Sequence, residues 1–238
     1  MFWFQEGLCC LPAFLVVWSS STFVVNYIIA LFRGDVDVVF PYISDTGASP
    51  PESCIFGLMS TITAFAGFAT MFARYKFLER LNEITGGVSP ALNKAALFFA
   101  ITCCVGMCVV ATFQETELTI VHDIGASIFF VSGMIYIILQ TIISHKAHPY
   151  GTSKRVCYIR TIFAIVAVLA TFPTFICAFF VKATKLHWNP EDKAYPLHLA
   201  SAVSEWIVSY TFVFFFFTYI QEFKQFTLKV KVELLEFT

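Results

Sequence analysis

Long apolar runs alternate with short polar connectors along the whole chain. Six windows are almost entirely apolar, and each has the roughly 20 residues that a helix needs to cross about 30 Å of hydrocarbon. They lie at residues 8–32, 55–73, 95–113, 120–143, 159–181 and 197–220. Runs of this length could be buried helices of a water-soluble protein only in a much larger chain. The pattern therefore predicts an all-α polytopic membrane protein, a bundle of six transmembrane helices in one domain over residues 1–238.

The composition supports lipid as the solvent of this chain. Of 238 residues, 58% are hydrophobic, 18% aromatic and 13% charged, whereas soluble domains carry about 25% charged residues. The first apolar run has no basic residue before it and no small-residue cleavage site after it, so we expect a retained span and not a removed signal peptide. The net charge of −1 gives no reason to expect nucleic acid as a partner.

The connectors differ in positive charge. An even number of spans places both termini on one side of the membrane. Residues 74–94, residues 144–160 and the C-terminal tail, which lie on that side, hold eleven of the fifteen Lys and Arg residues. The positive-inside rule then places both termini in the cytosol. Residues 33–54, 114–119 and 182–196 are expected to face the lumen or the outside.

The string Asp45-Thr46-Gly47 matches the catalytic loop of an aspartic protease. Such an enzyme needs two carboxylates that share one proton across a β-sheet scaffold. A second Asp-Thr-Gly string and any strand-rich segment are absent from the sequence. The same residues are turn formers, because Asp can bond to nearby backbone and Gly supplies a positive φ. We interpret the segment as an ordered loop that caps the bundle, with Asp45 as a candidate functional residue.

A polar stripe runs along the sixth predicted span. His198, Ser201, Glu205 and Ser209 are spaced by three, four and four residues, which places them on one face of a helix. An ionisable group in mid-membrane costs a few kcal/mol and usually faces protein or water. Two interpretations stay open for Glu205. It is either a hydrogen-bonded link between helices, or a proton-sensitive or ligand-contacting group.

A second polar pair, His122 and Asp123, begins the fourth span. Neighbouring helix positions point about 100° apart, so the pair suits helix capping as readily as catalysis. With His198 and Glu205, it could in principle assemble the metal centre of a membrane hydrolase. Metal-ligand spacing within one helix is missing, however. The sequence therefore assigns no catalytic, metal-binding or cofactor-binding residue, and no cofactor is expected.

Short motifs are spread over essentially the whole chain. They are Phe40-Pro41-Tyr42-Ile43-Ser44-Asp45-Thr46-Gly47, Pro51-Glu52, Arg74-Tyr75-Lys76, Phe113-Gln114-Glu115, His122-Asp123, Leu186-His187-Trp188-Asn189-Pro190, Glu205-Trp206 and Thr218-Tyr219-Ile220-Gln221. Taken together, these motifs resemble the DRAM proteins, the damage-regulated autophagy modulators. Where that family usually has Asn before the Phe-Gln pair, this chain has Thr112.

The resemblance implies a six-span protein of lysosomal and late endosomal membranes that promotes autophagy and is linked to p53-dependent cell death. It supplies no established catalytic residues, so we expect a non-enzymatic regulator. The expected partners are the lipid bilayer, lipids, and autophagy or lysosomal membrane proteins. Two alternatives remain. One is a transporter or lipid-handling membrane protein, suggested by the stripe that contains Glu205, and the other is a membrane-embedded lipid hydrolase that would need a bound metal.

Overall fold

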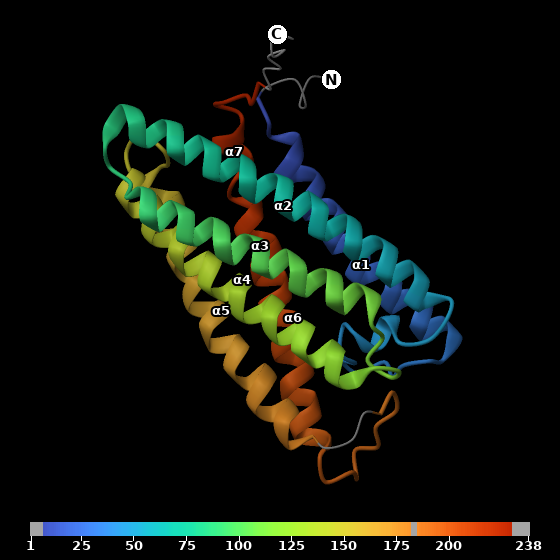
Figure 1. Ribbon diagram of the computed structural model, residues 1–238. Coiled ribbons are helices and arrows are strands. Elements are labelled where there is room, and N and C mark those ends of the chain that lie inside the picture. Colours follow the sequence, from blue (N-terminus) through green and yellow to red (C-terminus); the bar gives the residue numbers. More distant parts are fainter. Residues whose placement is uncertain (1–6, 182–184, 230–238) are drawn as a thin grey trace, which may run out of the picture.

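Six long helices form the molecule, and the computed structural model describes residues 7–181 and 185–229 (Figure 1). The helices are α1 Cys10–Arg33, α2 Glu52–Thr85, α3 Pro90–Thr112, α4 Thr119–Ala147, α5 Lys154–Phe180 and α6 Tyr195–Phe217. Two short elements complete the fold, the 3₁₀ turn η1 Asp45–Gly47 and the helix α7 Ile220–Phe223. All six long helices have the length and apolar composition to cross a membrane, and the described residues contain no strand. The predicted all-α bundle of six helices is confirmed.

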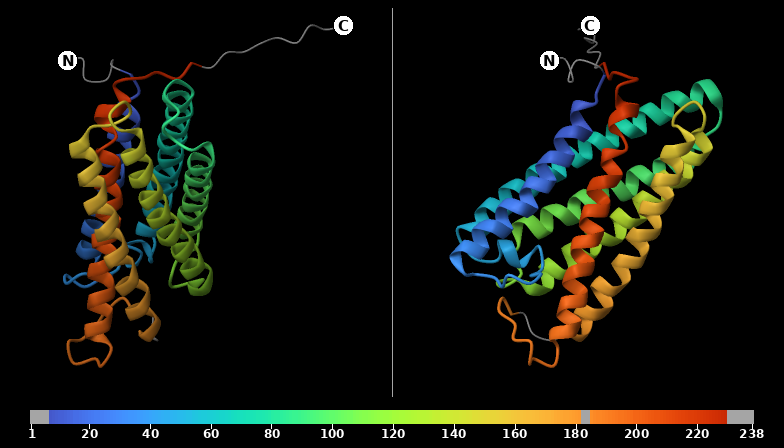
Figure 2. Two further views of the ribbon diagram at one scale, coloured as in Figure 1. Left: turned by 90° about the vertical axis from the view of Figure 1, so that its left-hand side faces the viewer. Right: turned by 180° about the vertical axis from the view of Figure 1, so that it is seen from behind.

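The helices pack in chain order as a closed ring. Each long helix contacts the next one along the chain, and α1 returns to contact α6 (Figure 2). Because the number of long helices is even, the start of α1 and the end of α6 lie at one end of the bundle, together with α7 (Figure 1). We call this the terminal end. The opposite end, which carries residues 34–51, 113–118 and 185–194, is called the loop end.

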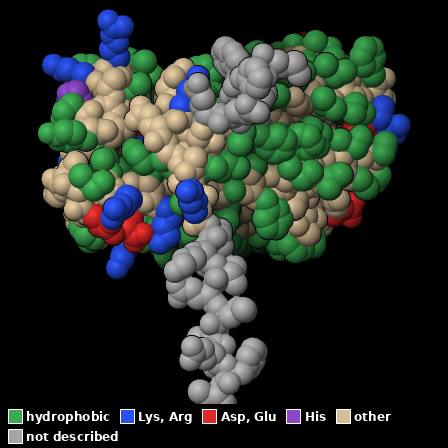
Figure 3. Space-filling view, turned by 90° about the horizontal axis from the view of Figure 1, so that it is seen from above, with side chains coloured by type: hydrophobic (Ala, Val, Ile, Leu, Met, Phe, Trp, Pro, Cys, Tyr) green, Lys and Arg blue, Asp and Glu red, His purple; other side chains and the backbone are tan. Residues whose placement is uncertain are grey.

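Apolar side chains cover the outside of the bundle, whereas small residues fill its contacts. Phe65, Leu169 and Phe179 are at least 67% exposed although they lie within apolar helices. Ala96 and Ala202 are completely buried, as expected where helix backbones approach closely in a membrane. Exposed Lys and Arg side chains lie at the rim of the terminal end, where Figure 3 looks down on the bundle. This distribution suits a bundle surrounded by lipid.

Helices α3 and α4 approach each other closely. A Cβ atom added at Gly106 would lie 2.5 Å from the backbone nitrogen of Phe129 and 2.8 Å from the carbonyl oxygen of Gly125. One added at Gly125 would meet the side chain of Val109 at 2.6 Å. These two glycines let the helix backbones touch, and this contact fixes the connector between α3 and α4, residues 113–118.

Helix α2 is longer than the apolar window that predicted it. The window ends at residue 73, but the helix continues to Thr85 and stops where Gly86 adopts a left-handed conformation with φ of 66°. Charged pairs three residues apart, Lys76 with Glu79 and Arg80 with Glu83, stabilise this extension. A window that averages hydropathy detects only apolar segments, so it did not predict this polar extension of the helix.

A buried ion cluster ties the terminal end together. Arg74 of α2 and Arg160 of α5 are both 0% exposed, and their Nη1 atoms lie 2.5 Å and 3.0 Å from the carboxylate oxygens of Glu222 in α7. The ring of Tyr219 lies against both guanidinium groups, 5.2 Å and 4.6 Å from their central carbons. Gln140 of α4 accepts a further hydrogen bond from Arg74. The terminal ion cluster, defined by Arg74, Arg160 and Glu222, therefore docks α7 onto the bundle.

Candidate functional site

The Asp-Thr-Gly segment folds as a buried turn at the loop end. The Asp45 carboxylate accepts a hydrogen bond from the backbone N–H of Tyr42 at 3.1 Å, and the Thr46 hydroxyl donates to the carbonyl oxygen of Ile43 at 2.6 Å. Asp45 is 3% exposed and Thr46 is 0% exposed. The expectation of an ordered cap is confirmed, but the reason for the glycine was wrong. Gly47 has a negative φ, and it is needed because a Cβ there would lie 2.3 Å from the ring of Phe56.

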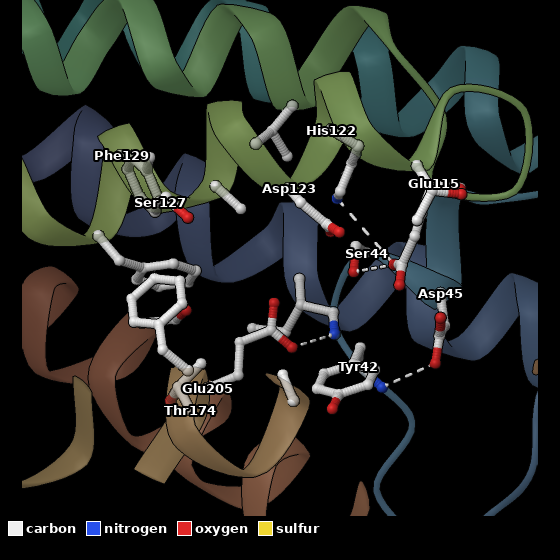
Figure 4. Close-up of a pocket in the computed structure, with 18 of the residues that line it drawn as sticks. Tyr42, Ser44, Asp45, Glu115, His122, Asp123, Ser127, Phe129, Thr174 and Glu205 are labelled. Atoms are coloured by element: carbon white, nitrogen blue, oxygen red, sulfur yellow. Dashed lines mark hydrogen bonds and ion pairs between the residues drawn. The ribbon is translucent and has the colours of Figure 1, made fainter. Parts of the chain in front are cut away.

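Two carboxylates from other parts of the chain hold this turn. Glu205 of α6 accepts a hydrogen bond from the backbone N–H of Ile43 at 2.9 Å. Glu115, in the connector between α3 and α4, accepts one from the Ser44 hydroxyl at 2.6 Å. Figure 4 shows Asp45, Glu115 and Glu205 around the same turn. The turn therefore gathers carboxyl groups from three separate segments.

Burial changes the proton affinity of the two carboxyls that lie outside the helices. It raises the pKa of Asp45 well above the ordinary value, and the negative charges of Glu115 and Glu205 raise it further. Burial also raises the pKa of Glu115, although the nearby His122 and the hydrogen bond from Ser44 oppose this change. The protonated forms of both carboxyls are thus favoured in the folded protein.

His122 is held beside Glu115 in a defined orientation. Its Nδ1 lies 2.7 Å from the carbonyl oxygen of Phe113, and its Nε2 lies 4.0 Å from Glu115 Oε2. A carbonyl oxygen can only accept, so Nδ1 carries the hydrogen and Nε2 faces the carboxyl group. Asp123, the next residue, is exposed, whereas His122 is buried. Neighbouring positions on a helix point in different directions, which explains why the two side chains differ in exposure.

These groups line a cavity of about 390 Å³ at the loop end. Its polar lining includes Tyr42, Ser44, Asp45, Glu115, His122, Asp123, Lys185 and Glu205, and its apolar lining includes Phe23, Phe56, Met107, Phe129, Phe130 and Phe175. Figure 4 shows Ser127 and Phe129 on α4 across the cavity from Glu205. Its volume falls within the range of about 300–1,000 Å³ that is usual for ligand pockets.

The predicted candidates do not all reach this cavity. Asp45, His122, Asp123 and Glu205 line it, whereas His198 and Ser201 do not appear in its wall. The His198 ring stacks on Trp188 with ring centroids 4.5 Å apart, and it forms a T-shaped contact with the Tyr42 ring at 4.9 Å.

Ser201 links two helices. Its hydroxyl donates to the carbonyl oxygen of Thr174 at 2.6 Å, which joins α6 to α5. Glu205, one turn further along the stripe, joins α6 to the loop through Ile43 and also lines the cavity. Glu205 therefore has a linking role, and its role as a proton-sensitive or ligand-contacting group stays a prediction.

Sequence reasoning missed Glu115 and Trp188 as members of the site. Glu115 follows the third span and Asp45 the first, and successive spans alternate in direction, so the presence of Glu115 near the loop end could have been inferred. Trp188 is positioned by Asp37, whose carboxylate accepts from the Trp188 backbone N–H at 2.7 Å and lies 3.0 Å from His187 Nδ1. No sequence pattern signals that contact between two loops.

The arrangement does not supply a metal-ligand set within the part of the chain that the structure describes. No group of three or more His, Cys, Asp or Glu side chains there could hold a metal ion. The neighbours of Asp45 are two glutamates on unrelated segments. The loop end therefore has the geometry of a binding cavity with acidic walls.

The raised pKa values predict that acid stabilises the folded protein. An unfolded carboxyl titrates near pH 4. Asp45 and Glu115 bind protons more tightly when folded, so their stabilising effect is complete below about pH 4 and is lost as pH rises through their folded pKa values. We expect a melting temperature a few degrees higher at about pH 5 than at about pH 7.5, since each unit by which a pKa is raised is worth about 1.4 kcal/mol.

Thermal unfolding of purified protein in detergent at several pH values measures this effect. Asp45→Asn should reduce the slope of melting temperature against pH, whereas Glu117→Gln, which changes an exposed carboxyl at the same end, should leave it unchanged. Equal slopes for Asp45→Asn and the unmodified protein would contradict the assignment.

Comparison with known proteins defines the relationships of this fold. Residues 7–226 match the family model described as Frag1/DRAM/Sfk1/Cwh43P N-terminal domain. The chain belongs to the Frag1/DRAM family. Within the family, it is 42% identical over 234 residues to DNA damage-regulated autophagy modulator protein 1 of Homo sapiens, covering 98% of each chain.

Two further relatives extend the comparison. DNA damage-regulated autophagy modulator protein 2 of Mus musculus is also 42% identical, over 98% of this chain and 90% of the relative. The modulator of macroautophagy TMEM150B-A of Xenopus laevis is 29% identical over 84% of this chain and 79% of the relative. No solved structure matches the chain significantly. The identities to DNA damage-regulated autophagy modulator proteins 1 and 2 place the chain in the DRAM group.

Proposed function

We propose that this chain is a multi-pass membrane protein that modulates autophagy as a non-enzymatic regulator. The observation that carries the proposal is the 42% identity, over nearly the full length, to proteins named DNA damage-regulated autophagy modulators. A more distant relative is named a modulator of macroautophagy. The matched 234 residues, 98% of this chain, span both the loop end and the terminal end.

The proposal extends to location and orientation. We place the protein in lysosomal and late endosomal membranes, where it promotes autophagy and contributes to p53-dependent cell death. The terminal end faces the cytosol in this proposal, because its rim holds exposed cations such as Arg80, Lys146 and Lys154 (Figure 3). The loop end would then face an acidic lumen, a condition that favours the protonated forms of Asp45 and Glu115.

A knockout with rescue tests this function. After DNA damage, cells without the protein should show reduced autophagic flux, measured as the extra accumulation of an autophagosome marker when lysosomal degradation is blocked. Re-expression should restore flux, and the rescuing protein should co-localise with a lysosomal membrane marker. Flux that is unchanged in the knockout would contradict the proposal. Epitope tags at both termini that become accessible when only the plasma membrane is permeabilised would support the orientation.

The cavity favours a second candidate, a lipid-handling or transport protein. Its volume of about 390 Å³ and its mixture of carboxyl groups and phenyl rings are those of a binding pocket. If the protein has this function, binding or transport of a molecule by the cavity would cause the modulation of autophagy.

A further inference from the structure

The cavity at the loop end is lined by more acidic than basic side chains. Four carboxyl side chains line it, those of Asp45, Glu115, Asp123 and Glu205. Its basic lining groups already have partners. Lys185 Nζ lies 3.2 Å from the Asp192 carboxylate, and His122 Nδ1 is bonded to a backbone carbonyl. Burial favours the protonated carboxyls when no cation is bound, but a bound cation would favour their ionised forms. The cavity is therefore suited to a cation and offers little to a phosphate group.

Two deeply buried polar side chains have unused hydrogen-bonding capacity on the cavity wall. Glu205 is 8% exposed, and only its Oε2 is bonded, to the Ile43 backbone N–H, while the other carboxylate oxygen turns toward the cavity in Figure 4. Ser60 of α2 is 0% exposed and lines the cavity, and its hydroxyl has no hydrogen-bond partner among the described residues. Buried polar groups are normally paired, so the Ser60 hydroxyl and the second Glu205 oxygen are both available to a polar ligand.

An aromatic ring provides a second feature that favours an ammonium group. Tyr42 lines the cavity near the carboxyl groups. An ammonium group is attracted to the face of an aromatic ring within about 6 Å. Trp188 shows the same attraction at this end of the molecule, because Lys185 Nζ lies 5.1 Å from its centroid, but its ring is already occupied by Lys185 and by the stacked His198. Tyr42 is therefore the ring available to a ligand beside the carboxyl groups.

The cavity becomes apolar toward the middle of the bundle. It shares the lining residues Phe23, Met107, Phe129 and Ser209 with a smaller, nearly apolar cavity of about 70 Å³. Phe179 on α5 also lines the main cavity and is 79% exposed, so the cavity reaches the outer surface of the helix bundle. An amphiphile could therefore enter from the membrane with its polar head at the loop end.

We propose that this cavity binds a single-chain amphiphile with a cationic ammonium head. The ammonium group lies between Glu205, Ser60 and the ring of Tyr42, and the hydrocarbon chain lies along Phe129 toward the smaller cavity. The proposal concerns the ligand of the candidate site and does not depend on the role in autophagy, because purified protein is enough to test it.

The test uses the full chain in lipid nanodiscs and a matched set of probes. Dodecylamine, dodecanol and dodecanoate share one chain and differ in head charge, while tetramethylammonium supplies a cationic head without a chain. Binding is followed by tryptophan fluorescence, with stoichiometry from native mass spectrometry. We expect saturable binding of one dodecylamine, and binding of the other three probes that is weaker by at least about tenfold.

Each alternative outcome has a definite meaning. Equal binding of dodecylamine, dodecanol and dodecanoate would overturn the proposal, because partition into the bilayer would explain it. Binding of tetramethylammonium as tight as that of dodecylamine would also overturn it, in favour of a soluble amine. Tighter binding of dodecanoate would reverse the assigned charge.

Two variants test the head and the chain separately. Glu205→Gln removes the charge but keeps an acceptor for the Ile43 N–H, and it should weaken dodecylamine binding by about tenfold or more. Gly67→Leu fills the smaller cavity, where an added Cβ would meet only side-chain atoms at 3.7 Å and 4.0 Å, and it should weaken binding without touching a carboxyl group. Glu117→Gln is the matched control. Affinities for dodecylamine that are the same in Glu205→Gln and Glu117→Gln would overturn the proposal, and Gly67→Leu tests it independently if Glu205→Gln does not fold.

Discussion

Replacing Glu222 with alanine is expected to lower the free energy of unfolding by about 3–5 kcal/mol, the usual cost of removing one partner from a buried ion pair. The carboxylate of Glu222 contacts both Arg74 and Arg160, and both guanidinium groups are 0% exposed. Without Glu222, two buried cations would share one space beside Tyr219. Since α7 is docked through this residue, the terminal end of the bundle should open first.

Resistance to unfolding by a denaturing detergent, followed by circular dichroism, measures this loss. Glu83→Ala is the matched control, because Glu83 forms an exposed pair with Arg80 at the same end of the molecule and exposed pairs contribute less than about 1 kcal/mol. Replacing Arg74 and Arg160 with methionine and Glu222 with leucine should recover much of the loss, since apolar residues of similar size can substitute for a buried ion cluster. A loss in Glu222→Ala no larger than in Glu83→Ala would show that the cluster contributes nothing to stability.

The terminal ion cluster also marks the limit of the sequence prediction of the fold. Apolar periodicity was enough to predict six helices, because each window is long and lipid leaves few other structures for the backbone. Arg74 and Arg160 stand at the edges of those windows and were counted as loop charges. They are buried instead, because Glu222, more than 60 residues from either of them in the sequence, neutralises part of their charge. Only the packing of α7 reveals that pairing.

The candidate site, too, could be predicted from the sequence only in part. The spacing of His198, Ser201, Glu205 and Ser209 correctly predicted one buried face of α6, since helical periodicity alone decides it. Which of these residues line the cavity depends on neighbours that the spacing does not specify. Ser201 packs against α5, whereas Glu205 meets the loop that contains Ile43. The bond between Ser44 and Glu115 joins residues 71 positions apart, and it exists only because the contact between α3 and α4 sets the position of their connector.

That contact leads to a second large effect, for Gly106→Ala. An alanine in mid-helix normally gains up to about 1 kcal/mol over glycine. At Gly106, however, the new methyl group would lie 2.5 Å and 2.8 Å from backbone atoms of α4, which cannot rotate away. Overpacking of this kind costs about 1–3 kcal/mol or more. We therefore expect net destabilisation in Gly106→Ala and none in Gly67→Ala, where the nearest atoms are flexible side-chain ends at 3.7 Å and 4.0 Å.

The two alanine variants also separate stability from the geometry of the site. Pushing α3 away from α4 displaces the connector that holds Glu115, so the bond from Ser44 should weaken and dodecylamine should bind less tightly to Gly106→Ala. Gly67→Ala adds one methyl group to the apolar cavity and leaves that connector in place. Unfolding in the denaturing detergent gives the stability difference, and tryptophan fluorescence titration gives the affinity. Equal stability of the two variants would mean that the α3–α4 backbones have room to separate, and the close approach at Gly106 would then not be what positions Glu115.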